Sequence, residues 1–175
     1  PLAVIAKFAA GGKQVSRKDL ALQAISYGNV YVAQVALGAN PQQTLEAFRE
    51  AEAFPGTSLI IAYSHCIAHG IDMQKGLHQQ HLAVESGYWP LFRYNPLLRD
   101  AGENPFRLDS LRPSIPLRDY AYNELRYRAL DVAHHAEAEG LLEQAQKVVV
   151  ERYETYEEIA SGNHERLLAM SLLKK

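Results

Sequence analysis

The sequence LIIAYSHCIAHG, residues 59–70, decides the fold of this chain. Its first part, residues 59–63, is a short apolar run typical of a buried strand. The second part, residues 64–70, is predicted to form the loop at the carboxyl end of that strand. In open α/β sheets, ligands and cofactors bind at this end of the strands. The loop contains Cys66, the only cysteine of the chain, so we expect the chemistry of this chain to lie there.

A second apolar segment precedes this one and is also predicted to be a strand. Residues 30–37 are rich in β-branched and apolar side chains, which favours a buried strand. The helix that connects the two strands is predicted to have Asn40 as its N-cap and Pro41 at its first position. Pro55 ends this helix. The two strands and their helix form a βαβ unit, which predicts parallel pairing.

Three further elements extend this pattern on both sides. A helix is predicted to begin at the N-cap Ser16 and to end at Gly28. A polar helix is predicted around residues 79–85, and an aromatic strand at residues 89–94, where Pro90 favours an edge position. The alternation of strands and helices predicts an α/β fold with a parallel-rich sheet flanked by helices.

The second half of the chain has a different pattern. Residues 95–118 contain four prolines, and we expect little regular structure there. The segment 119–159 carries a long amphipathic helical pattern, which we expect to break near Gly140. We therefore divide the chain into residues 1–118, which carry the sheet, and a helical carboxyl-terminal tail at 119–175.

The composition of the chain excludes some classes of protein. The chain has 175 residues, with 18 Lys and Arg against 20 Asp and Glu, for a net charge of −2. This balance argues against nucleic-acid binding, which favours a basic patch. No segment reaches the ~20 apolar residues that span a bilayer, and none resembles a signal peptide. A single cysteine fits a reducing compartment, so we expect a soluble, cytoplasmic protein. The first residue, Pro1, suggests a fragment of a longer chain.

Several readings of Cys66 remain open from the residues alone. It could be a small buried hydrophobic residue. It could bind zinc, because residues 65–81 also contain ligand-type histidines, although their spacing matches no standard zinc site. These histidines are His65, His69, His78 and His81. Cys66 could also be a nucleophile activated by a histidine, as in a thiol hydrolase, although no orienting third group is evident.

Several segments together resemble one known family. They are residues 18–20, 27–33, 38–40, 43–45, 47–52, 58–67, 86–94, 104–106 and 108–110. In this order and at these intervals they resemble the pyruvate:ferredoxin (flavodoxin) oxidoreductases. The resemblance weakens after about Arg128. It corresponds to the carboxyl-terminal part of a much longer enzyme, in the later half of its thiamine-diphosphate-binding domain.

The resemblance implies an oxidoreductase. Enzymes of this family use thiamine diphosphate and Mg²⁺ to decarboxylate pyruvate oxidatively to acetyl-CoA, with coenzyme A as the acyl acceptor. Electrons leave through [4Fe-4S] clusters to ferredoxin or flavodoxin, and the complete enzyme is expected to be a homodimer. The resemblance identifies Cys66 as one cysteine ligand of the cluster nearest to thiamine diphosphate.

The same resemblance implies that this chain works only with the remainder of the oxidoreductase. The family's Gly-Asp-Gly stretch for Mg²⁺ and diphosphate is not in this sequence, and neither are the other cysteine ligands. We therefore expect the isolated chain to be inactive and to bind neither cofactor tightly. The alternative is a non-catalytic remnant or a structural subunit of a split enzyme. An adjacent reading frame with the missing motifs would favour the enzyme.

Overall fold

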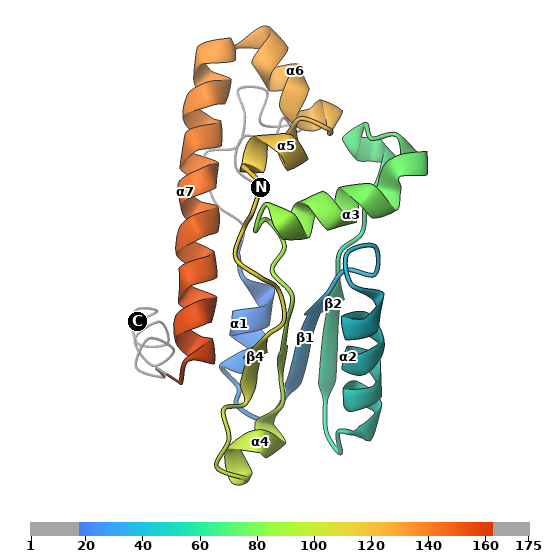
Figure 1. Cartoon of the computed structure of the whole chain (residues 1–175), viewed down its shortest axis with the longest axis vertical. Coiled ribbons are helices and arrows are strands. Elements are labelled where there is room, and N and C mark those ends of the chain that lie inside the picture. Colours follow the sequence, from blue (N-terminus) through green and yellow to red (C-terminus); the bar gives the residue numbers. More distant parts are fainter. Residues whose placement is uncertain (1–17, 163–175) are drawn as a thin grey trace.

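In the part of the chain that the structure describes, four short strands form one sheet, with neighbours in the order β2-β1-β3-β4 (Figure 1). The computed structural model describes residues 18–162. The strands are β1 (Tyr31–Val35), β2 (Ser58–Ala62), β3 (Phe92–Tyr94) and β4 (Phe106–Leu108). The α-helices are α1 (Leu20–Ile25), α2 (Pro41–Ala53), α3 (Gly76–Glu85), α4 (Pro96–Asp100), α5 (Leu117–Ala121), α6 (Leu125–Ala133) and α7 (His135–Ala160). Two 3₁₀ turns, η1 (Ile67–His69) and η2 (Met73–Lys75), lie between β2 and α3.

The α/β class and the flanking helices are confirmed, but the described sheet is mixed rather than parallel-rich. β1 pairs in parallel with β2, while β3 is antiparallel to both β1 and β4. Helix α2 supplies the crossover that a parallel pair requires. Helix α3, in contrast, lies across the end of the sheet at which β2 finishes (Figure 1). The chain therefore re-enters the sheet from that same end, and β3 must run in the opposite direction.

The two faces of the sheet are covered by different helices. On one face, Tyr31, Ala33 and Val35 of β1 pack with Ala47 of α2. On the other face, Val32 and the aromatic residues of β3 and β4 pack with α1 and the end of α7. The aromatic residues of this second cluster are Phe92, Tyr94, Phe106 and Tyr156. Side chains that alternate along β1 thus belong to two cores, as the period of two in a strand requires.

A third core lies beyond the end of the sheet and joins the second half of the chain to α3. Ala83 of α3 and Trp89 pack there with α5, α6 and the first half of α7. Because α7 contributes both to this core and to the core on the sheet, it holds the helical region against the strands. The carboxyl end of β2 lies between these two parts of the molecule (Figure 1).

Helix boundaries agree with the sequence where a side chain can cap them. The Asn40 side chain accepts a hydrogen bond from the Gln43 backbone at 2.9 Å, with Pro41 as the first residue of α2, as predicted. Helix α1 is capped by Asp19, whose carboxylate accepts from the Leu22 backbone at 2.9 Å. The predicted cap Ser16 lies outside the described residues.

Other expectations for the strands were wrong. Strand β2 is at the edge of the sheet and is only partly buried, whereas a buried strand was expected. Strand β3 is interior rather than at an edge. Pro90 precedes β3, so its missing N–H costs no hydrogen bond between strands. Its carbonyl instead accepts from Gln34 Nε2 at 2.6 Å.

The second half of the chain is also more regular than expected. Residues 95–118 contain α4, β4 and the start of α5, because Asn95 caps α4 and β4 pairs with β3. Gly140 lies inside the continuous helix α7, and the helical region instead breaks before Leu125 and at His134. A helix of this length tolerates one glycine at a cost of about 1 kcal/mol.

Candidate functional site

The loop at the carboxyl end of β2 forms as predicted. The Tyr63 backbone donates to the Val35 carbonyl at 2.9 Å, which is the last bond between these segments. After Cys66 the chain forms one tight turn, in which the His69 backbone donates to the Cys66 carbonyl at 3.0 Å. Gly70 ends this turn with a φ of 73°, a conformation that glycine adopts without strain. The bond from Tyr63 to Val35 thus holds the backbone before Cys66, and the turn holds the backbone after it.

Cys66 carries a free thiol that is half-buried. Its backbone is extended, and the next side chain, Ile67, is 73% exposed. No side-chain hydrogen bond joins the thiol to any residue between 18 and 162. The thiol is therefore neither deep in a core nor paired with a described base, and it is accessible to a ligand from outside this part of the chain.

Gly70 joins the loop to the start of α6. The Leu125 backbone donates to the Gly70 carbonyl at 3.3 Å. A Cβ atom added at Gly70 would lie 2.3 Å from the Cβ atom of Leu125, closer than real side chains allow. The loop therefore depends on a glycine both for its backbone conformation and for this close contact.

A buried carboxylate, Glu124, lies behind the loop. It is fully buried, and its Oε1 accepts from Tyr120 Oη and Gln79 Nε2 at 3.2 Å each and from Tyr63 Oη at 3.4 Å. Its Oε2 pairs with Nε of Arg126, which balances the charge. Burial raises the pKa of the Tyr63 hydroxyl, and it raises the pKa of Tyr120 as well. Both hydroxyls therefore stay protonated well above neutral pH. They also lie 2.8 Å from each other, so their two protons are shared between this mutual hydrogen bond and Glu124 Oε1.

Arg126 also contacts the loop itself through His69. Arg126 Nη1 lies 3.3 Å from His69 Nε2, and the two residues are 57 positions apart in sequence. Burial and the positive charge of Arg126 lower the pKa of His69. A neutral ring with Nε2 as acceptor fits this contact. Its Nδ1 is buried with no hydrogen-bond partner among the described residues.

His65 is held on the opposite side of the loop by α3. Its Nδ1 lies 3.1 Å from Gln80 Nε2, while Gln80 Oε1 accepts from the Gly38 backbone at 2.8 Å. Its ring also packs closely on Gly76, where a Cβ atom would lie 2.2 Å from Nε2. These contacts give His65 a role in packing the loop between α3 and the turn after β1.

The structure does not bring the candidate zinc ligands together. Within residues 18–162, no three His, Cys, Asp or Glu side chains are arranged to hold a metal ion. His81 instead lies 3.4 Å from Glu85 along α3. The described part of the chain offers one thiolate, whereas a [4Fe-4S] cluster requires four ligands. It therefore fits such a cluster as the donor of one ligand and not as its whole site.

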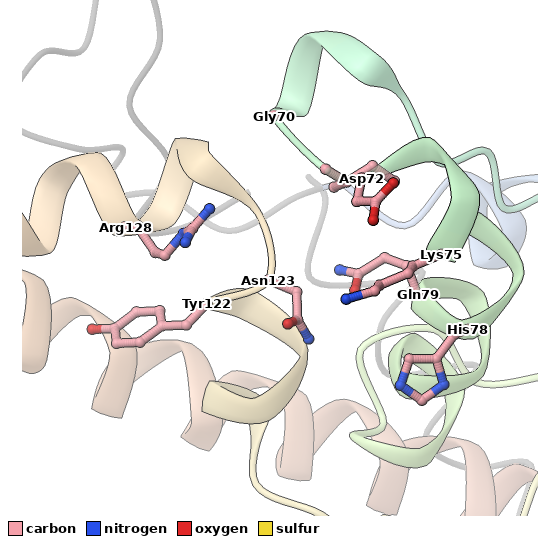
Figure 2. Close-up of a pocket in the computed structure, with 9 residues that line it drawn as sticks. Gly70, Asp72, Lys75, His78, Gln79, Tyr122, Asn123 and Arg128 are labelled. Carbon is pink, nitrogen blue, oxygen red and sulfur yellow. The ribbon is translucent and has the colours of Figure 1, made fainter.

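A cavity of about 220 Å³ is lined by Gly70, Asp72 and other residues of the segment that follows the loop, together with residues 122, 123 and 128. Figure 2 shows Asp72, Lys75 and Gln79 on one wall and Asn123 and Arg128 on the other. This cavity cannot be predicted from the sequence. Its walls come from segments far apart in the chain, and no local motif links them.

None of the helices within residues 18–162 has the length and apolar character needed to cross a membrane.

Comparison with known proteins gives close relatives. No family model matches the sequence. The chain is 54% identical over 161 residues to a pyruvate-flavodoxin oxidoreductase of Nostoc sp., covering 92% of this chain and 13% of that protein. It is 48% identical over 158 residues to a pyruvate:ferredoxin oxidoreductase of Moorella thermoacetica, covering 90% of this chain and 14% of that protein. It is 41% identical over 160 residues to a probable pyruvate-flavodoxin oxidoreductase of Escherichia coli, with coverages of 91% and 14%. The chain thus spans about one seventh of the length of these curated relatives.

Proposed function

Because this chain is homologous to one segment of the pyruvate-flavodoxin and pyruvate:ferredoxin oxidoreductases, we propose that it works as that segment of such an enzyme. The reaction is the oxidative decarboxylation of pyruvate to acetyl-CoA, with electron transfer to ferredoxin or flavodoxin. The observation that carries the proposal is 54% identity over 92% of the chain. A matched stretch of that length necessarily includes the loop with Cys66.

Cys66 is proposed to supply one thiolate ligand of a [4Fe-4S] cluster. The support is its position after β2, its half-buried free thiol and the absence of a side-chain partner within residues 18–162. When bound, the cluster carries electrons, and thiamine diphosphate with Mg²⁺ stabilises the carbanion chemistry of pyruvate. The remaining ligands and the binding groups for thiamine diphosphate are proposed to come from the rest of the polypeptide.

The described residues are proposed to hold the thiol in position. The contact of Gly70 with Leu125 fixes one end of the loop, and the packing of His65 on Gly76 fixes the other. Glu124 and Arg126 form a buried charge pair behind the loop. A preorganised ligand loses less conformational entropy when it binds. The chain thus contributes a rigid ligand and the scaffold beside it.

We propose partners of four kinds for this segment. They are the remainder of the oxidoreductase chain, pyruvate, coenzyme A, and ferredoxin or flavodoxin, in a cytoplasmic enzyme that is a homodimer when complete. The isolated chain is proposed to be inactive and to bind neither cluster nor thiamine diphosphate tightly.

The test replaces Cys66 with serine in a complete oxidoreductase. A suitable host is the Nostoc sp. enzyme with its matching segment exchanged for this chain. We expect Cys66→Ser to lose the iron and sulfide of one cluster, together with its electron paramagnetic resonance signal and pyruvate-dependent reduction of flavodoxin. The matched control is Ser64→Ala, in the same loop, which is expected to retain all three. Unchanged cluster content together with an unchanged electron paramagnetic resonance signal in a folded Cys66→Ser enzyme would show that Cys66 only packs.

A further inference from the structure

Strand β2 ends the described sheet on one side. It pairs with β1, and no residue within 18–162 pairs with its other edge (Figure 1). An open strand edge of this kind is a template for pairing with another strand.

The hydrogen bonds at its two ends show which backbone groups point outward. The Tyr31 backbone donates to the Thr57 carbonyl at 3.0 Å, and Tyr63 donates to the Val35 carbonyl at 2.9 Å. In a parallel pair, every second residue directs both backbone groups to the same neighbour. The residues between these bonds that face β1 are therefore Leu59 and Ile61. Those that face away are Ser58, Ile60 and Ala62.

The side chains of β2 are those of an interior strand. Leu59 and Ile61 pack against the core on the α1 and α7 face, while Ile60 packs against α2 on the other face. A strand that is apolar on both faces is typical of the interior of a parallel sheet. None of the residues 58–62 is a lysine, another charged residue or a proline, the residues that natural edge strands use to block pairing.

We propose that the outward edge of β2 pairs with a strand of the remaining oxidoreductase polypeptide, which makes β2 an interior strand of the assembled enzyme. The inference rests on the proposed function in one respect, namely that this chain acts together with that polypeptide. The relatives supply ample chain for it, because this segment covers only 13% of the Nostoc sp. protein. The loop with Cys66 follows β2 immediately. A strand of the remaining oxidoreductase polypeptide that pairs along β2 would therefore have one end close to the thiol.

Hydrogen exchange at single-residue resolution tests the pairing, because alternate amides of one strand act as internal controls. The amides of Ser58, Ile60 and Ala62 are expected to exchange at least about tenfold more slowly in the complete Nostoc sp. chimera than in this chain alone. The amides of Leu59 and Ile61, which already bond to β1, are expected to be protected in both.

A substitution in β2 provides a second test of the pairing. Ile60→Pro removes an outward N–H without removing a bond to β1. In the chimera it is expected to abolish the added protection of Ser58 and Ala62 while Leu59 and Ile61 remain protected. The matched variant Ile60→Val keeps the N–H and is expected to behave as the parent does. Because the exchange pattern of the parent is decisive by itself, the test stands even if Ile60→Pro folds poorly.

Two results would overturn the proposal. One is equally fast exchange of Ser58, Ile60 and Ala62 in the chain alone and in the complete enzyme. The other is strong protection of these amides in the chain alone. Dependence of that protection on concentration would then identify a second copy as the occupant, and independence would identify a segment of this same chain. The loss of a cluster in Cys66→Ser is measured separately, so failure of the proposed ligand role is distinguishable from failure of the strand pairing.

Discussion

The guanidinium of Arg93 meets the carboxylate of Asp109 at two points, with Nε 2.8 Å from Oδ2 and Nη2 2.9 Å from Oδ1. The side chains are 8% and 9% exposed. Arg93 Nη1 also lies 2.6 Å from Glu50 Oε1. This buried group joins the central strand β3 to α2 and to the segment that follows β4. These charged neighbours raise the pKa of Arg93 above its ordinary value, so the guanidinium stays charged.

Removal of Arg93 is expected to destabilise the fold strongly. Arg93→Leu leaves the buried Asp109 carboxylate without its charged partner, with only the hydrogen bond from Gln43 remaining among the described residues, and breaking such a buried pair costs about 3–5 kcal/mol. The double variant Arg93→Leu, Asp109→Leu is expected to recover part of this loss, because no buried charge is left at Asp109. Urea unfolding of both variants measures the free energies.

The control for this experiment is an exposed pair. Arg112 pairs with Glu157, but its side chain is 74% exposed. Because solvent screens such pairs, Arg112→Leu is expected to leave the unfolding midpoint almost unchanged. Equal losses for Arg93→Leu and Arg112→Leu would contradict the importance of burial.

The buried Glu124 is expected to be necessary for the loop that carries Cys66. Glu124→Ala removes the acceptor of three side chains and leaves Arg126 without its partner, which is expected to cost about 3–5 kcal/mol of unfolding free energy. Glu124→Gln keeps the shape and one acceptor oxygen, so its loss is expected to be smaller. Urea unfolding gives both values, and Glu124→Ala with parental stability would refute the role of this network.

Two glycines with the same backbone conformation allow the cost of a close contact to be measured separately from the cost of backbone strain. Gly70 and Gly102 have φ values of 73° and 77°. Alanine at either site is expected to cost about 1–2 kcal/mol for that conformation. Gly70→Ala also meets Leu125, whereas no described atom beyond its chain neighbours lies within 4 Å of a Cβ at Gly102. We therefore expect Gly70→Ala to lower the thermal midpoint clearly more than Gly102→Ala, and equal shifts would exclude the contact.

Alkaline pH is expected to unfold the chain through its buried tyrosines. Burial raises the pKa of Tyr63, Tyr120 and Tyr127 above the ordinary value of 10.0. Near pH 10 the unfolded chain loses these protons while the folded chain keeps them, so stability is full below about pH 10 and falls as the pH rises above it. Tyrosinate absorbance and circular dichroism are expected to change together. Tyr63→Phe is expected to make the fall less steep, and complete ionisation with a native spectrum would contradict the prediction.

The local elements were predictable where neighbouring residues decide them. The cap at Asn40 with Pro41 fixes the start of α2 through a bond between near neighbours. The failures arose where distant segments compete. Pro90 favours an edge strand by itself, yet β3 became interior because β4 pairs with its second edge. Gly140 weakens a helix, but α7 continues through it because packing on two cores stabilises the helix on both sides.

The order of residues by itself determined that this chain has an α/β fold, that a loop follows the strand at residues 58–62, and that the single thiol lies in that loop. Only the tertiary structure decided the direction of β3, the position of β2 at the edge of the sheet formed by residues 18–162, and the burial of Glu124 behind the loop. The reason is the range of the forces involved. Caps, turns and apolar periodicity depend on residues that are close together in the sequence. The contact of Arg126 with His69 joins positions 57 residues apart, and it exists only once α6 has packed beside the loop.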